Sequence, residues 1–129
     1  MRLWHQKLIS KLPRQQLLGQ HRECCALRGA GWGKKHSTVD YVFTHNPDKL
    51  VAYHCLVMNE MEARGYHPNP VWKDVSYRGK VLGYSEDNWC YIHNVLNLVS
   101  SGNIIYSEHN DDYLKECLDN LKEKGIEIL

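Results

Sequence analysis

Apolar side chains recur at helical spacing in four stretches of the chain, residues 13–28, 46–65, 85–101 and 110–124. Intervals of three and four residues place such side chains on one face of an α-helix. We therefore expect four amphipathic helices. The side chains expected to face the core in the second to fourth helices are Leu50, His54, Val57, Met58 and Met61; Trp89, Ile92, Leu96 and Val99; and Leu114, Cys117, Leu118 and Leu121.

Residues at the ends of these stretches are typical of helix boundaries. Asn46 suits the N-cap and Pro47 the first turn of the second helix, and Gly65 suits its end. Pro13 is expected to open the first helix, and Gly29 to end it in a left-handed conformation.

Segments rich in glycine and proline connect the helices at residues 28–43 and 67–84, and we expect loops there with little strand. A chain of 129 residues with 43% hydrophobic content suffices for one core. The expected fold class is therefore mainly α, a compact single-domain bundle of three to four helices with long loops, with residues 1–129 as that single domain.

Composition also indicates the cellular setting. No stretch approaches the roughly 20 apolar residues needed to cross a bilayer, and polar residues interrupt the first ten positions. Five cysteines without a CxxC motif suggest free thiols in a reducing compartment. We expect a cytoplasmic monomer without a membrane partner.

The charge of the chain is unevenly distributed, although its formal net value is only +1. Residues 1–36 carry eight basic side chains and one acidic one, Glu23, whereas the remaining 93 residues carry eight basic and fourteen acidic ones. This asymmetry favours a local surface for a polyanion. The alternative is a solvated basic face without a partner.

The first predicted helix presents a polar stripe formed by Gln15, Gly19, Arg22 and Ala26, opposite an apolar side. The two small residues leave room for a phosphate backbone, and Arg22 can contact phosphate or a base edge. Glu23 flanks this stripe. It is either a solvated partner of a nearby arginine or an acid/base group at a DNA-binding surface.

The succession Leu8, Ser10, Leu12, Gln15 and Leu17, followed by "RE" at 22–23, resembles the start of the pyrimidine-dimer DNA glycosylase/AP lyase family, of the phage endonuclease five type and its bacterial branch. The segments "KKHSTVDYVF" and "DKLVAYHCLVMNEMEARGYHP" are similar to a histidine-containing loop and the second helix of that family. The resemblance covers roughly residues 1–70 of the chain, and residues 71–129 form the C-terminal helices and loops.

This resemblance implies a base-excision repair enzyme that acts on double-stranded DNA containing damaged or abasic sites. In the family the N-terminal amine attacks the sugar C1′, an imine forms, the base leaves and β-elimination cuts the strand. Carried onto this chain, Glu23 assists proton transfer, and the nucleophilic amine belongs to Met1, or to Arg2 if Met1 is removed. An α-amine suits this role because its pKa is near 7.7–8.0, so about 10% is neutral at pH 7.

The resemblance makes Arg22, Gln15 and His36 DNA contacts, and Arg2 is a further candidate. The basic loop "GAGWGKKH" adds Lys34 and Lys35 as phosphate contacts and Trp32 as a base-stacking side chain. No cofactor is expected. The pairs His21/Cys24 and Cys90/His93 have ligand-like spacing but lack further ligands, so no metal is predicted.

Two other functional classes remain open. A non-catalytic duplex-DNA-binding protein would keep this scaffold without the nucleophile, and would still lose affinity steeply with salt. An interaction protein unrelated to DNA would bind duplexes no better than other proteins of equal net charge.

Overall fold

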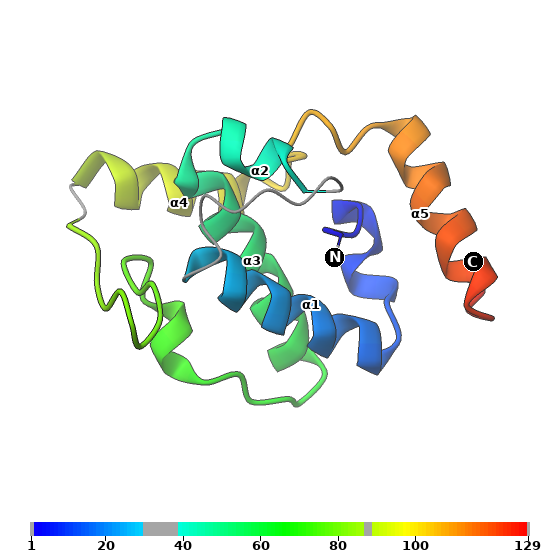
Figure 1. The fold of residues 1–129 in the computed structure, drawn as a ribbon, viewed down its shortest axis with the longest axis horizontal. Coiled ribbons are helices and arrows are strands. Elements are labelled where there is room, and N and C mark those ends of the chain that lie inside the picture. The colour runs from blue at the N-terminus through cyan, green and yellow to red at the C-terminus, as the bar shows by residue number, and fades with distance from the viewer. Residues whose placement is uncertain (1, 30–38, 87–88, 129) are drawn as a thin grey trace.

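The computed structural model describes residues 2–29, 39–86 and 89–128. Regular secondary structure in this part of the chain is helical, apart from an isolated bridge between Tyr77 and Tyr84 (Figure 1). The mainly α class predicted from the sequence is therefore confirmed. The elements are η1 (Gln6–Lys11), α1 (Arg14–Arg28), α2 (Tyr41–Thr44), α3 (Pro47–Ala63), η2 (Pro70–Lys73), α4 (Trp89–Ser101) and α5 (Asp111–Glu123).

Helix α3 is the centre of the fold and contacts α1, α2, α4 and η1. The five side chains predicted to form its inner stripe are all buried. Val51, Ala52 and Tyr53 are buried as well, because the helix has neighbours on more than one side.

Helix α1 has the predicted division between a core face and a polar face. Leu17 and Cys24 are buried, whereas Gln15, Arg22 and Ala26 are exposed. Two details differ from expectation. Arg28 is fully buried and adds nothing to the cationic surface, and Gly29 has φ −92°, so it does not use the left-handed conformation. Its missing side chain matters instead, because a Cβ there would lie 3.0 Å from the Arg78 carbonyl oxygen.

Helix α5 buries Cys117 and Leu121, as predicted. Helix α4 begins at Trp89 rather than Ser85 and buries Val95, while Leu96 is 57% exposed, so Leu96 was wrongly assigned to the core. Several consecutive positions of α4 are apolar, so periodicity alone does not select the face that packs on α3. The cysteines are free thiols, and no helix in the described ranges has the length and apolarity to span a membrane.

His109 is a buried histidine next to η1 and α5. Its ring stacks on those of His5 and Tyr113, and its Nδ1 accepts a hydrogen bond from the Gln6 backbone N–H at 3.1 Å. Burial lowers the pKa of His109 to about 3. In the unfolded chain a histidine has a pKa of about 6.5, so between these two values only the unfolded state takes up the proton.

The free energy of unfolding is therefore expected to fall as pH falls from about 6.5 towards 4, with His109 contributing up to about 1.4 kcal/mol per pH unit. Urea unfolding across this range measures the slope. In His109→Asn the side-chain oxygen can still accept from Gln6, and the slope should be shallower by that amount. The comparison isolates His109 because all other titrating groups are common to both proteins, and parallel slopes would contradict the assignment.

Candidate functional site

A buried glutamine of α1 ties the start of the chain to Glu23. The Nε2 group of Gln20 donates to the Arg2 carbonyl oxygen at 3.0 Å and to Glu23 Oε2 at 3.1 Å. Its Oε1 accepts from the Trp4 backbone N–H at 2.6 Å and from the Tyr53 hydroxyl at 3.0 Å. All these hydrogen bonds converge on one amide that is only 1% exposed, so the backbone of residues 2–4 is held in a defined position beside Glu23.

Glu23 is half-buried at this position, and burial raises its pKa above the usual value. The positive charges of the N-terminal amino group, Lys124 and Arg22, together with a backbone hydrogen bond from Arg2, act in the opposite direction but are smaller than the effect of burial. A carboxyl group with a raised pKa can exchange a proton closer to neutral pH than an exposed glutamate.

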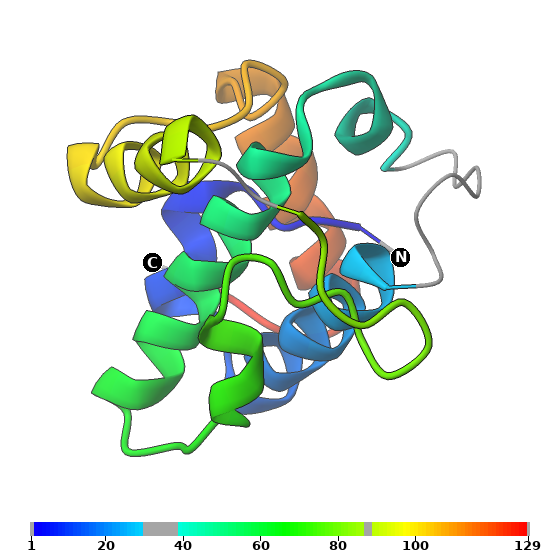
Figure 2. The ribbon, with the colours of Figure 1, turned by 90° about the vertical axis from the view of Figure 1, so that its left-hand side faces the viewer.

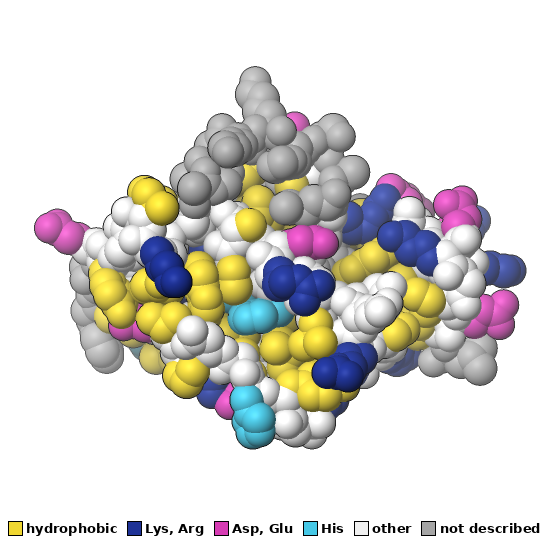
Figure 3. Space-filling view, turned by 60° about the horizontal axis from the view of Figure 1, so that its bottom comes forward, with side chains coloured by type: hydrophobic (Ala, Val, Ile, Leu, Met, Phe, Trp, Pro, Cys, Tyr) yellow, Lys and Arg dark blue, Asp and Glu magenta, His cyan; other side chains and the backbone are white. Residues whose placement is uncertain are grey.

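The polar face of α1 continues outward from this carboxylate. Gln15 and Arg22 are exposed and lie seven residues apart, on the same side of the helix. Among the described residues outside the backbone of α1, a Cβ on Gly19 would have one neighbour within 4 Å, Arg22 Nη2 at 3.8 Å. On the face of the molecule in Figure 3, lysine and arginine side chains are interspersed with hydrophobic ones.

Arg2 contributes its backbone and its side chain to different surroundings. The carbonyl group lies at the Gln20 amide, whereas Nη1 pairs with Glu116 of α5 at 3.3 Å and the guanidinium lies near the rings of Trp4 and Tyr113. The structure thus brings Arg2 and Glu23 together through the backbone. The other predicted site residues Met1, Trp32, Lys34, Lys35 and His36 lie outside the described residues.

Gln20 and Tyr53 are the site residues that the sequence analysis missed. A signal for Gln20 was present, because it falls three residues after Leu17 and four before Cys24, on the apolar side of α1. A polar side chain in such a stripe needs buried hydrogen-bond partners. The positions of those partners along the chain gave no indication of the contact.

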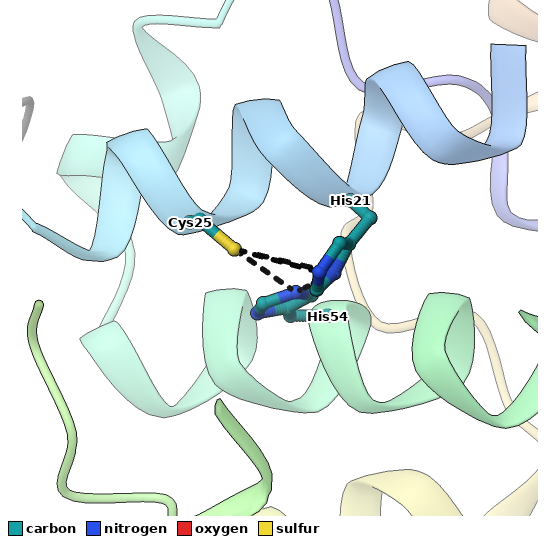
Figure 4. A group of neighbouring side chains, drawn as sticks. All are labelled: His21, Cys25 and His54. Carbon is teal, nitrogen blue, oxygen red and sulfur yellow. Dashed lines mark hydrogen bonds between the residues drawn. The ribbon is translucent and has the colours of Figure 1, made fainter. Parts of the chain in front are cut away.

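His21, Cys25 and His54 form a second cluster, between α1 and α3 (Figure 4). His21 Nδ1 lies 2.8 Å from His54 Nε2, and Cys25 Sγ lies 3.9 Å from the same nitrogen. The cluster differs from the pair His21/Cys24 considered above, because Cys24 is fully buried elsewhere in the core. Its three side chains are close enough to consider a metal ion.

The hydrogen bonds around this cluster do not fit a metal. His54 Nδ1 lies 3.0 Å from Arg28 Nη1, and a guanidinium can only donate. The proton of neutral His54 is therefore on Nε2, where it is donated to His21 and blocks the lone pair that a metal would need. Burial also raises the pKa of the Cys25 thiol to about 11. The cluster is best described as a hydrogen-bonded contact between the two helices.

Comparison with known families places the chain in a class of DNA-repair glycosylases. A family model described as pyrimidine dimer DNA glycosylase matches residues 1–74, more than half of the chain. The chain belongs to the pyrimidine dimer DNA glycosylase family. The matched residues include Arg2, Gln20, Glu23 and Tyr53, whereas α4 and α5 lie beyond them. No curated protein and no solved structure matches the chain significantly.

Proposed function

We propose that this protein excises damaged bases, pyrimidine dimers in particular, from double-stranded DNA and cuts the strand through an imine formed by its N-terminal amine. The observation that carries the proposal is the Gln20 amide, which holds the backbone of Arg2 and the carboxylate of Glu23 together. A nucleophile at the start of the chain would thereby act beside a group able to transfer protons.

The chemistry requires an amine that is neutral and a carboxyl group that changes protonation state. The amine nitrogen forms a bond to the sugar C1′, the glycosidic bond breaks and the base leaves. The attacking nitrogen gives up two protons, one to the departing base and one to O4′ as the C1′–O4′ bond of the sugar ring opens, and this leaves the imine. Removal of a C2′ proton then expels the 3′ phosphate and cuts the strand. Glu23, with its raised pKa, is suited to the proton transfers in these steps.

The exposed polar face of α1 is the proposed DNA surface. Arg22 would contact phosphate or a base edge, and Gln15 would contact the backbone along the same face. The small residues Gly19 and Ala26 leave space for the strand to approach the helix. In this proposal Trp32, Lys34, Lys35 and His36 extend the surface, Arg2 adds a cation near the amine, and the protein acts as a monomer without cofactor or metal.

Borohydride trapping on abasic-site duplex tests the reaction directly. Reduction of the imine by sodium borohydride should leave a covalent protein–DNA adduct, and an undamaged duplex of the same sequence should give none. Peptide mapping of the adduct should place the DNA on the amine of Met1, or on that of Arg2 if Met1 has been removed. An adduct on a lysine side chain would overturn the assignment of the nucleophile. Duplex binding without any adduct would favour a non-catalytic DNA-binding protein.

A further inference from the structure

Residues 77–84 form a tight loop, which follows the part of the chain that matches the family model. Its two arms are joined by the bridge between Tyr77 and Tyr84 and by the hydrogen bond from Ser85 N to the Ser76 carbonyl oxygen at 2.8 Å. Within the loop, Arg78 N donates to Gly83 O at 2.7 Å and Gly83 N donates to Gly79 O at 2.8 Å. Gly79 and Gly83 have φ of 97° and 67°, a backbone conformation that residues other than glycine rarely adopt. The loop is therefore a closed turn with a defined shape.

The base of this turn is fastened to the C-terminal end of α1. Arg28 donates to the carbonyl oxygens of Trp72, Asp74 and Tyr77 at 2.8–3.0 Å. Gly29 lies directly against the turn, with its Cα 3.8 Å from the position of a Cβ on Gly79. Figure 2 shows the turn beside this end of α1. The helix that carries Glu23 thus also positions the turn.

The tip of the turn is apolar and exposed. Val81 is 86% exposed and Leu82 is 55% exposed. Lys80, next to Val81, is exposed, whereas Arg78 is half-buried. Adjacent exposed hydrophobic side chains on a fixed turn indicate a contact surface, and the exposed cation Lys80 beside them favours an anionic partner.

We propose that Val81 and Leu82 are a wedge that enters the base stack of duplex DNA near the lesion while Lys80 lies along the phosphates. The wedge rests on the proposed function, because it uses the same DNA surface of α1. Apolar side chains inserted between base steps unstack and kink a duplex, which lowers the cost of extruding a nucleotide. Along α1, Glu23 and Gly29 are separated by about 9 Å, the height of two to three base steps. The tip would therefore enter the stack a few steps from the reacting sugar.

The test uses the full-length protein and duplexes that contain an abasic-site analogue unable to form an imine. A fluorescent base analogue, 2-aminopurine, is placed in turn at each of the neighbouring steps, where its emission rises on unstacking. The wild-type protein should raise the emission at one of these steps. In Val81→Ser/Leu82→Ser the rise should be largely lost, and affinity for this duplex should drop about tenfold. Affinity for undamaged duplex and the dependence of binding on salt should stay unchanged, since no charge is removed.

Leu96→Ser is the matched control, because Leu96 is similarly exposed on α4, and it should behave as wild type. An equal rise in emission for the wild type and the double variant would overturn the proposal that the tip enters the base stack. The exposed tip would then be assigned to contact with a protein partner. Absence of any rise with the wild type would overturn it too. If borohydride trapping gives no adduct but the rise in emission is still lost in the double variant, the role of Val81 and Leu82 as a wedge is supported and the proposed imine chemistry is rejected.

Discussion

Glu23→Gln is expected to reduce strand cleavage at abasic sites by about 10²–10⁴-fold, the usual contribution of a group that transfers protons. The substitution keeps the shape of the side chain and an oxygen that can accept from Gln20 Nε2, so the position of the chain start should be preserved. Duplex affinity should stay the same or rise slightly, because a negative charge leaves a phosphate-binding surface. Single-turnover cleavage and fluorescence anisotropy measure the two quantities separately.

The pH dependence of cleavage adds a second readout to this variant. Burial raises the pKa of Glu23, so a rate that requires its carboxylate should decline on acidification at a higher pH than for an ordinary glutamate. This decline should be absent from the residual activity of Glu23→Gln. Glu127→Gln, which removes an exposed carboxylate near the C-terminus, should match the wild type. Equal cleavage by Glu23→Gln and wild type would remove Glu23 from the mechanism.

Arg28→Met is expected to lower the free energy of unfolding by about 3–5 kcal/mol, because several acceptors lose their donor and each buried acceptor left unsatisfied costs about 1–3 kcal/mol. Methionine can fill the space of the arginine stem, but it leaves the carbonyl oxygens of Trp72, Asp74 and Tyr77 and the Nδ1 of His54 without their donor. Unsatisfied buried acceptors are costly. Urea unfolding followed by circular dichroism measures the change.

Arg14→Met provides the comparison for Arg28→Met. Arg14 is exposed and its guanidinium lies 5.4 Å from the centroid of the Tyr66 ring, an interaction worth about 0.5–1 kcal/mol at an exposed site. A similarly small loss for Arg28→Met would mean that the network around Arg28 contributes little to the fold.

The helices that the sequence predicts best are those with local boundary signals. Asn46, Pro47 and Gly65 delimit α3 to within two residues of its ends, since capping and backbone preferences act within one turn. The buried face of α4 was not predictable, because apolar residues on several sides let more than one face serve as the core side. Arg28 was counted with the surface cations, since nothing within one helical turn of it reveals the carbonyl groups that it binds in residues 72–77.

For the candidate site, the sequence by itself determined the family, the helix that bears Arg22 and Glu23, and the polar stripe that contains Arg22 and is flanked by Glu23, because spacing along one helix fixes which side chains lie together. Only the tertiary structure decided that the start of the chain lies beside Glu23, since the partners of Gln20 at residues 2, 4 and 53 come from separate segments of the chain. Likewise, only the packing of residues 72–79 on the end of α1 shows that the exposed tip at Val81 and Leu82 is attached to the helix that carries Glu23. Contacts of this kind depend on how whole elements pack, and local sequence preferences do not encode that packing.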